Sequence, residues 1–220
     1  MISIIEKNSS WIVVEKPEGM SVHNQEEGGD LLKHLSSQLK TSTQDLHPVH
    51  RLDKETSGLM IVALNATAAK DLHQIFEDKK VKKVYCAVLR GVFEKDEKWS
   101  WPISDKSEGR KKPQGISADR KEALTAVRIL RKSSYLTLAE CEIFTGRQHQ
   151  IRKHAVLAKH AILGDKRYGD DKYNTMIVTR YGLQRMALHA QKLSFDFQGV
   201  AYSFESPMPM ELEELFSEKM

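Results

Sequence analysis

HRLDKETSGLMIVAL, residues 50–64, joins a short polar segment directly to an apolar run. The run from 59 to 64 is apolar throughout, which predicts a strand buried on both faces of a sheet. The small residues at 56–58 can bond local backbone groups, and the glycine permits a close approach or a positive φ, so a fixed turn is expected before the strand. A carboxylate at Asp53 would then be held firmly while staying open to a ligand. Spacing alone, however, favours a surface loop with an Asp–Arg pair.

Hydrophobic spacing predicts the elements on either side of this segment. In chain order we expect a hairpin of strands 2–6 and 11–14, a helix 31–39 capped by Asp30, a helix capped by Asn65 or Thr67, a strand 81–92, strands 124–130 and 135–144, a helix 148–159, and a hairpin of strands 186–197 and 200–204. Residues 104–121 are expected to form an exposed loop, and the acidic segment from Pro209 a helix. No repeat or linker interrupts this order. The sequence therefore predicts one α+β domain over residues 1–220, built on a mixed, largely antiparallel sheet with flanking helices.

Charge and composition restrict the partners and the compartment. The net charge of +4 and the pI near 8.9 fit a polyanionic partner without establishing one. Basic residues outnumber acidic ones in 106–121 and 147–172, as a phosphate-binding face requires. No apolar run approaches the length of a membrane span, and the first residues lack the pattern of a signal peptide, so a cytoplasmic protein is expected. Cys86 and Cys141 are expected to be small buried hydrophobes in a reducing compartment.

The nine histidines raise the question of a metal site, which we do not predict. His149 and His154 lie five positions apart and therefore off one helical face, and no HExxH motif or cysteine pair would complete the ligands. The segment 53–56 also differs from the DxDxT phosphotransferase loop in its second acid and in the place of its threonine.

Residues 50–64 resemble the signature of the RluA-like RNA pseudouridine synthases, in which HRLD is followed by T-S-G and an apolar strand. Five further segments match that family in the same order: VVEKPEGMSVH at 13–23, KKVYCAV at 82–88, TGRQHQIR at 145–152, LGD to YG at 163–169 and LHA at 188–190. The resemblance spans residues 11–205 and identifies the chain as a member. Two departures are that the chain starts directly in the synthase domain, without the small N-terminal RNA-binding domain of several relatives, and that Ala155 stands where leucine is common.

The resemblance implies an isomerase that needs no cofactor. It would break the glycosidic bond of a uridine in ribosomal or transfer RNA, turn the uracil and rejoin it through carbon 5. Asp53 would be the essential carboxylate, and whether it attacks the base, attacks the sugar or assists elimination stays open. Tyr85 would pack on the base and help to remove the carbon 5 proton, and Arg147 would pair with Asp53. Without the resemblance, Tyr85 is typical of a strand aromatic facing the core, and Arg147 of a phosphate contact near a helix start.

The resemblance also points to an RNA-binding set. Arg51 would fill the gap left by the extruded uridine. The other candidate contacts are Lys16, His23, Lys83, Gln150, Arg152, Arg110, Lys111 and Lys112. Each of these alone is more often a solvated surface residue. The partner is then a structured RNA stem-loop, and the protein is expected to be a monomer, since no coiled coil or long apolar edge stands out.

Two other functions belong to different classes. One is a non-catalytic RNA-binding or folding-helper protein that keeps the synthase fold, and the other is a hydrolytic nucleic-acid glycosylase. The presence of Asp53, Tyr85 and Arg147 favours the synthase over the first. The second would need a water-activating base, which the sequence does not identify.

Overall fold

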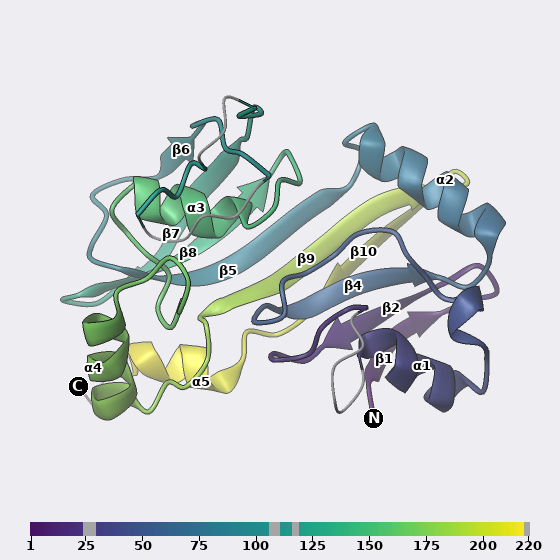
Figure 1. Ribbon diagram of the computed structural model, residues 1–220, viewed down its shortest axis with the longest axis horizontal. Helices are drawn as coiled ribbons and strands as arrows, with labels where there is room; N and C mark the ends of the chain where they lie inside the picture. Colours follow the sequence, from purple (N-terminus) through teal and green to yellow (C-terminus); the bar gives the residue numbers. More distant parts are fainter. Residues whose placement is uncertain (24–29, 106–110, 116–118, 218–220) are drawn as a thin grey trace. The chain divides into compact units, whose positions relative to one another are not determined.

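The computed structural model describes residues 1–23, 30–105, 111–115 and 119–217 (Figure 1). These fall into two compact units, an N-terminal unit of Met1–Lys83 with Ala190–Ser206 and a C-terminal unit of Val84–His189 with Pro207–Met220. The sheet strands are mostly antiparallel and helices flank them, which confirms the predicted α+β class. The single domain over residues 1–220 stays a prediction.

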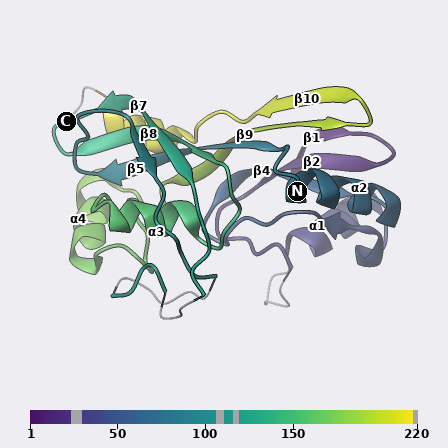
Figure 2. The same ribbon diagram turned by 90° about the horizontal axis from the view of Figure 1, so that it is seen from above.

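The N-terminal unit contains strands of the sheet and two helices. Its strands follow the order β1 (Ser3–Lys7), β2 (Trp11–Lys16), β4 (Ser57–Ala63), β9 (Leu188–Phe197), with β10 (Val200–Glu205) paired to β9 and the short β3 (His47–Pro48) to β4. Every residue of β4 is buried, which confirms the strand expected to be covered on both faces. Figure 2 shows the helices α1 (Leu31–Leu39) and α2 (Ala66–Glu77) on the same side of β1 and β2. A short 3-10 turn, η1 (Thr43–Asp45), follows α1.

Side-chain caps explain where the two helices begin. The Asp30 carboxylate accepts a hydrogen bond from the Lys33 amide at the start of α1, as predicted. The Asn65 side chain accepts one from the Ala68 amide, which decides between the two predicted caps of α2 in favour of Asn65. In the core of the same unit, Trp11 is completely buried. Its ring makes edge-to-face contacts with four aromatic rings: Phe195, Phe197, Tyr202 and Phe204.

The strands of the C-terminal unit follow the order β5 (Lys82–Arg90), β8 (Leu136–Ile143), β7 (Thr125–Lys132), β6 (Glu97–Trp99) in the sheet. The helix α3 (Gln150–Leu157) lies across one face of that sheet (Figures 1 and 2). The unit also contains α4 (Asp171–Tyr181), α5 (Met210–Glu213) and the 3-10 turn η2 (Glu214–Phe216). Strand β6 and helix α4 were not among the predicted elements.

The C-terminal unit contains both cysteines and the segment 104–121. Both cysteine thiols are free and buried, as predicted, and burial raises the pKa of Cys86 to about 12. The expected exposed loop at 104–121 is exposed only in part: Ser104 is buried, and its carbonyl accepts a hydrogen bond of 2.6 Å from the buried ammonium of Lys153. In the part of the chain that the structure describes, no helix has the length and apolarity that crossing a bilayer requires.

Candidate active site

Asp53 lies half-buried in a short turn that leads into β4. The turn closes through a hydrogen bond of 3.1 Å from the Thr56 amide to the Asp53 carbonyl. Leu52 is buried on one side of Asp53, and Thr56 is buried on the other. The carboxylate therefore stands on a turn that is held by buried residues at Leu52 and Thr56, as the sequence predicted for this segment.

Lys16, at the end of β2, forms a hydrogen bond to the backbone of this turn. Its side chain is completely buried, and the ammonium donates to the carbonyls of Pro17 (2.8 Å), Met20 (2.8 Å) and Lys54 (3.1 Å). Three carbonyl bonds use all three donors of the ammonium, and one of them ties the loop after β2 to the residue after Asp53. The prediction of Lys16 as an RNA contact does not fit this burial, so we assign Lys16 a structural role.

His50 anchors the other end of the turn, although no role was predicted for it from the sequence. Its Nε2 atom accepts a hydrogen bond of 3.1 Å from the Ile61 amide, and its ring stacks on Phe76 with the centroids 4.8 Å apart. Burial lowers the pKa of His50 to about 3, with a smaller contribution from the charge of Lys83. His50 is therefore a neutral acceptor, and its place as the first residue of the matched segment was the signal for it.

Gly58 allows β4 to pass close to its neighbour. Its φ is +114°, and a Cβ added there would lie 2.3 Å from the carbonyl oxygen of Ala190. Both the close approach and the positive φ expected from the sequence are confirmed.

Three other predicted RNA contacts lie in the N-terminal unit. Arg51 and His23 are exposed, as a surface contact requires. Lys83 is half-buried beside the Phe76 ring, 5.6 Å from its centroid, and burial lowers its pKa. All three stay predictions as RNA contacts.

The other two predicted catalytic residues belong to the C-terminal unit. Tyr85 is a buried residue of β5. Arg147 lies half-buried between β8 and α3, where its Nε donates to the Glu122 carbonyl at 3.1 Å. Since Asp53 lies in the N-terminal unit, the joint action of Asp53, Tyr85 and Arg147 stays a prediction.

Gln150, the first residue of α3, fixes the loop that carries Arg147. Its side-chain oxygen accepts hydrogen bonds from the Thr145 hydroxyl (2.6 Å) and the Arg147 amide (3.1 Å). Its amide nitrogen donates to the Leu124 carbonyl (2.9 Å) and the Thr125 hydroxyl (3.0 Å). With four bonds made inside the protein and only 3% of its surface exposed, Gln150 is a positioning residue, which does not fit the predicted RNA contact.

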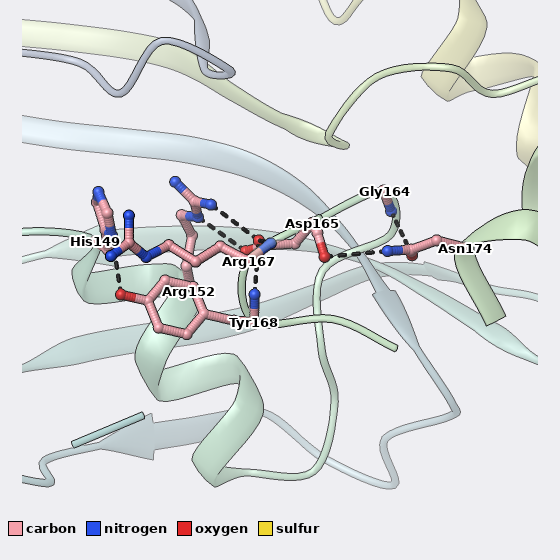
Figure 3. Close-up of polar contacts among 7 residues, drawn as sticks. All are labelled: His149, Arg152, Gly164, Asp165, Arg167, Tyr168 and Asn174. Atoms are coloured by element: carbon pink, nitrogen blue, oxygen red, sulfur yellow. Dashed lines mark hydrogen bonds and ion pairs between the residues drawn. The ribbon is translucent and has the colours of Figure 1, made fainter. Parts of the chain in front are cut away.

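Arg152 is likewise used inside the protein. Its guanidinium forms a two-pronged contact with the Asp165 carboxylate, at 2.8 and 2.9 Å, and both side chains are almost fully buried (Figure 3). Burial by itself raises the pKa of Asp165, but Arg152 and the amides of Tyr168 and Arg167 together hold that pKa below its usual range. The prediction of Arg152 as an RNA contact is therefore corrected as well.

Asp165 and Tyr168 connect this ion pair to the start of α3. The Tyr168 hydroxyl lies 2.9 Å from Nδ1 of His149, which adopts a positive φ of 54° where the helix begins (Figure 3). On the other side, the Asn174 side chain from α4 bonds the Gly164 amide at 3.1 Å and the Asp165 carbonyl at 3.0 Å. The matched segments at 145–152 and 163–169 thus form one hydrogen-bond network. The sequence identified both segments but did not predict the contacts between them.

The predicted basic cluster is described only in part. Lys111 and Lys112 are exposed, and Arg110 lies outside the described residues. Among the residues that the structure describes, no group of three or more histidine, cysteine, aspartate or glutamate side chains could hold a metal ion.

Comparison with known proteins identifies the family. The family model described as RNA pseudouridylate synthase matches residues 10–156. The chain is 34% identical over 226 residues to Ribosomal large subunit pseudouridine synthase D of Neisseria meningitidis serogroup A, covering 98% of this chain but 60% of that protein. It is 34% identical over 217 residues to tRNA pseudouridine synthase C of Pasteurella multocida, covering 88% of this chain and 85% of that protein.

A solved structure agrees with these matches. Human RNA Pseudouridylate Synthase Domain Containing 4 superposes with a TM-score of 0.79 at 25% identity, covering 96% of this chain and 90% of that one. The family model covers the Asp53 turn, β5 and the loop of Arg147 together. As its resemblance to the RluA-like enzymes predicted, the chain belongs to the RNA pseudouridylate synthase family.

Proposed function

We propose that the chain is an RNA pseudouridine synthase that isomerises a uridine in structured ribosomal or transfer RNA, with Asp53 as its catalytic carboxylate. The observation that carries the proposal is the family match over residues 10–156, which contains the Asp53 turn. The fixed backbone of that turn supports it, because Lys16 and His50 use their polar atoms to hold it in place. We further propose that the protein acts in the cytoplasm as a single monomeric catalytic domain.

The reaction is an internal exchange of bonds at one nucleotide. The bond from uracil N1 to the sugar breaks, a bond from uracil C5 to the same sugar carbon forms, C5 loses its proton and N1 gains one. The balance needs no oxidant, reductant or group donor, so no cofactor is part of the proposal. A pocket that excludes water would keep the detached base from being lost to hydrolysis.

Three side chains would share the work in this proposal. Asp53 would act on the flipped nucleotide through its carboxylate, and Arg147 would keep that carboxylate ionised as its partner. Tyr85 would pack on the base and help to move the C5 proton. Arg51, which is exposed beside Asp53, would fill the space that the flipped uridine leaves in the RNA.

The test is the replacement Asp53→Asn. We expect a loss of pseudouridine formation of about ten-thousand-fold or more, as is common when a catalytic nucleophile is removed. Chemical mapping of pseudouridine in total RNA from cells with and without the gene would identify the target, and the variant should fail to restore it. Asp45→Asn, an exposed carboxylate of the same unit, is the matched control and should restore it fully.

The same assay separates the alternatives. Normal modification by Asp53→Asn would refute the catalytic role of that residue. If no position depends on the gene at all, the catalytic proposal fails and the non-catalytic RNA-binding alternative is favoured. Release of free uracil from the RNA would instead show a glycosylase.

The basic cluster has its own test. Replacing Arg110, Lys111 and Lys112 together by alanine should weaken RNA binding and make its dependence on salt shallower, by about 0.7 to 0.9 in log–log slope for each phosphate that is no longer neutralised. Turnover at saturating RNA should survive. An unchanged slope would remove the cluster from the RNA-binding face.

A further inference from the structure

The C-terminal unit contains a pocket that none of the roles above explains. It has a volume of about 370 Å³ and lies among the end of β5, the turn that joins β7 to β8, and α4. Figure 1 shows these three segments at one end of the unit. The side chains that matter in its lining are three tyrosines, two arginines and a methionine: Tyr135, Tyr173, Tyr181, Arg90, Arg180 and Met176.

Helix α4 presents one stripe of side chains to the pocket. Tyr173, Met176 and Arg180 follow one another at intervals of three and four, so they share a face of the helix. The neighbouring Ile177 is buried and fastens the helix to its unit. Because Ile177 anchors the helix, the side chains of the stripe keep their position without being buried in the core.

Another part of the pocket lining, at Gly91 and Tyr135, is fixed by hydrogen bonds of the backbone. The Gly91 amide donates to the Tyr135 carbonyl at 2.8 Å, and the Thr137 hydroxyl donates to the Gly91 carbonyl at 2.9 Å. These bonds fix the main chain at Tyr135, yet 62% of the surface of that residue is exposed. A large ring on a rigid backbone that nothing covers is suited to stacking on a partner.

The two arginines bring positive charge to the same space. The guanidinium carbon of Arg90 lies 4.2 Å from the centroid of the Tyr173 ring, and that of Arg180 lies 5.4 Å from the Tyr181 ring. Partial burial raises the pKa of the Tyr173 phenol, the charge of Arg90 opposing it, so this ring is neutral at physiological pH. No carboxylate lines the pocket, and in the described part of the chain neither guanidinium forms an ion pair.

Aromatic faces together with unpaired guanidinium groups match the chemistry of an unpaired nucleotide. Bases stack on tyrosine rings, and phosphates bind arginine. The volume is within the range of pockets for small ligands, which starts at about 300 Å³. An apolar peptide would leave both charges unmatched, and an acidic one would leave the tyrosine faces without a flat partner.

We propose that this pocket binds one unpaired nucleotide of the RNA substrate, with its base on Tyr135 and its phosphate at Arg180. As a substrate contact it rests on the proposed function, and it would add affinity for RNA outside the reacting uridine. The pocket takes no part in the bond exchange, so its loss raises KM for RNA and leaves kcat unchanged.

Met176 provides a local probe of binding. Protein labelled with ¹³C in its methionine methyl groups is titrated with a single-stranded RNA octamer of mixed sequence, and separately with uridine monophosphate. The Met176 signal, assigned with Met176→Leu, should shift with both ligands and at lower concentration with the octamer.

Tyr135→Ala should weaken binding of the octamer at least about five-fold, the lower end of a base-stacking contribution. Arg180→Gln should make the salt slope shallower by about 0.7. Two residues of α4 outside the lining are the controls, and Val178→Ala and Lys172→Gln should bind as the unaltered protein does.

Several results would overturn the inference. One is a Met176 signal that does not move with RNA, and another is a shift that Tyr135→Ala leaves intact. A third is an equal shift with inorganic phosphate, which would show a site for the anion alone, and a fourth is a shift with peptides only. Asp53→Asn protein should give the same titration, so the pocket and the proposed reaction fail separately: a shift without pseudouridine formation supports the pocket and refutes the reaction.

Discussion

The ammonium of Lys16 is enclosed by three carbonyl oxygens, and one of them belongs to the residue beside Asp53. Arg152 forms an ion pair with the Asp165 carboxylate. The side chain of Gln150 forms hydrogen bonds with four groups of the protein. Lys16 holds the turn of Asp53 and Gln150 holds the loop of Arg147, whereas Arg152 holds the loop of Asp165. Their polar atoms are therefore bonded to other groups of the protein.

Lys16→Met tests this role. The methionine keeps the volume but leaves a buried side chain without its bonds to three carbonyls, so we expect the free energy of unfolding to fall by about 2–4 kcal/mol. Urea unfolding measures the loss, and Lys7→Met, an exposed lysine of β1, is the control that should change little. The salt slope of RNA binding should stay the same. A stable Lys16→Met protein with a shallower slope would instead restore the predicted RNA contact.

His50 predicts how stability depends on pH. Its pKa is about 3 in the folded protein, against 6.5 for a histidine side chain in water, so between these values the unfolded chain holds a proton that the folded chain does not. The free energy of unfolding should therefore fall as the pH drops below about 6.5, by about 2 kcal/mol at pH 5 from this residue. Burial also lowers the pKa of His189, to about 4, and that of His154, which adds to the loss.

The part that belongs to His50 can be isolated by substitution. In His50→Gln the amide oxygen can still accept from Ile61 but does not titrate, so the fall between pH 7 and pH 5 should be smaller by about 2 kcal/mol. His73→Gln, an exposed histidine of α2, should leave the fall unchanged. Equal pH profiles for the unaltered protein and His50→Gln would show that His50 is not the neutral acceptor described above.

Among the elements, β4 depends on one glycine. Gly58→Ala places a Cβ 2.3 Å from a backbone oxygen that cannot turn aside, at a φ that is also unfavourable for alanine. We expect a loss of about 3 kcal/mol or more in the free energy of unfolding. Gly199→Ala in the β9–β10 turn has a positive φ but open space around the added atom, so it should cost only about 1 kcal/mol. Similar losses at the two positions would mean that β4 can shift to make room.

The sequence predicted most of the helices and strands but missed β6 and α4. The buried strand β4 and the hairpins have apolar patterns of their own, and Asp30 and Asn65 cap helices through local bonds. Helix α4 is mostly polar and buries only Ile177, so its periodicity was weak, although a cap at Asp170 and Gly182 at its end were available signals. The site residues divide in the same way: the turn of Asp53 is local, whereas the burial of Lys16 depends on partners up to 38 positions away.

We expect the two compact units to unfold together. The boundaries between them fall inside β5 and β9, so two strands continue from one unit into the other along the chain. Unfolding one unit alone would therefore break each of these strands near its first residues, at the Lys83/Val84 and His189/Ala190 boundaries. We therefore expect one cooperative transition, as the predicted single domain requires.

Hydrogen exchange in increasing urea measures this without altering the protein. Peptides from β4, in the N-terminal unit, and from β8, in the C-terminal unit, should lose protection at the same urea midpoint. Gly58→Ala sharpens the test because its clash lies wholly within the N-terminal unit. In a single cooperative domain the substitution lowers the midpoint of β8 as far as that of β4, since neither strand can unfold alone. If β8 keeps its original midpoint while β4 unfolds early, the chain consists of two independently stable domains, and the prediction of one is wrong.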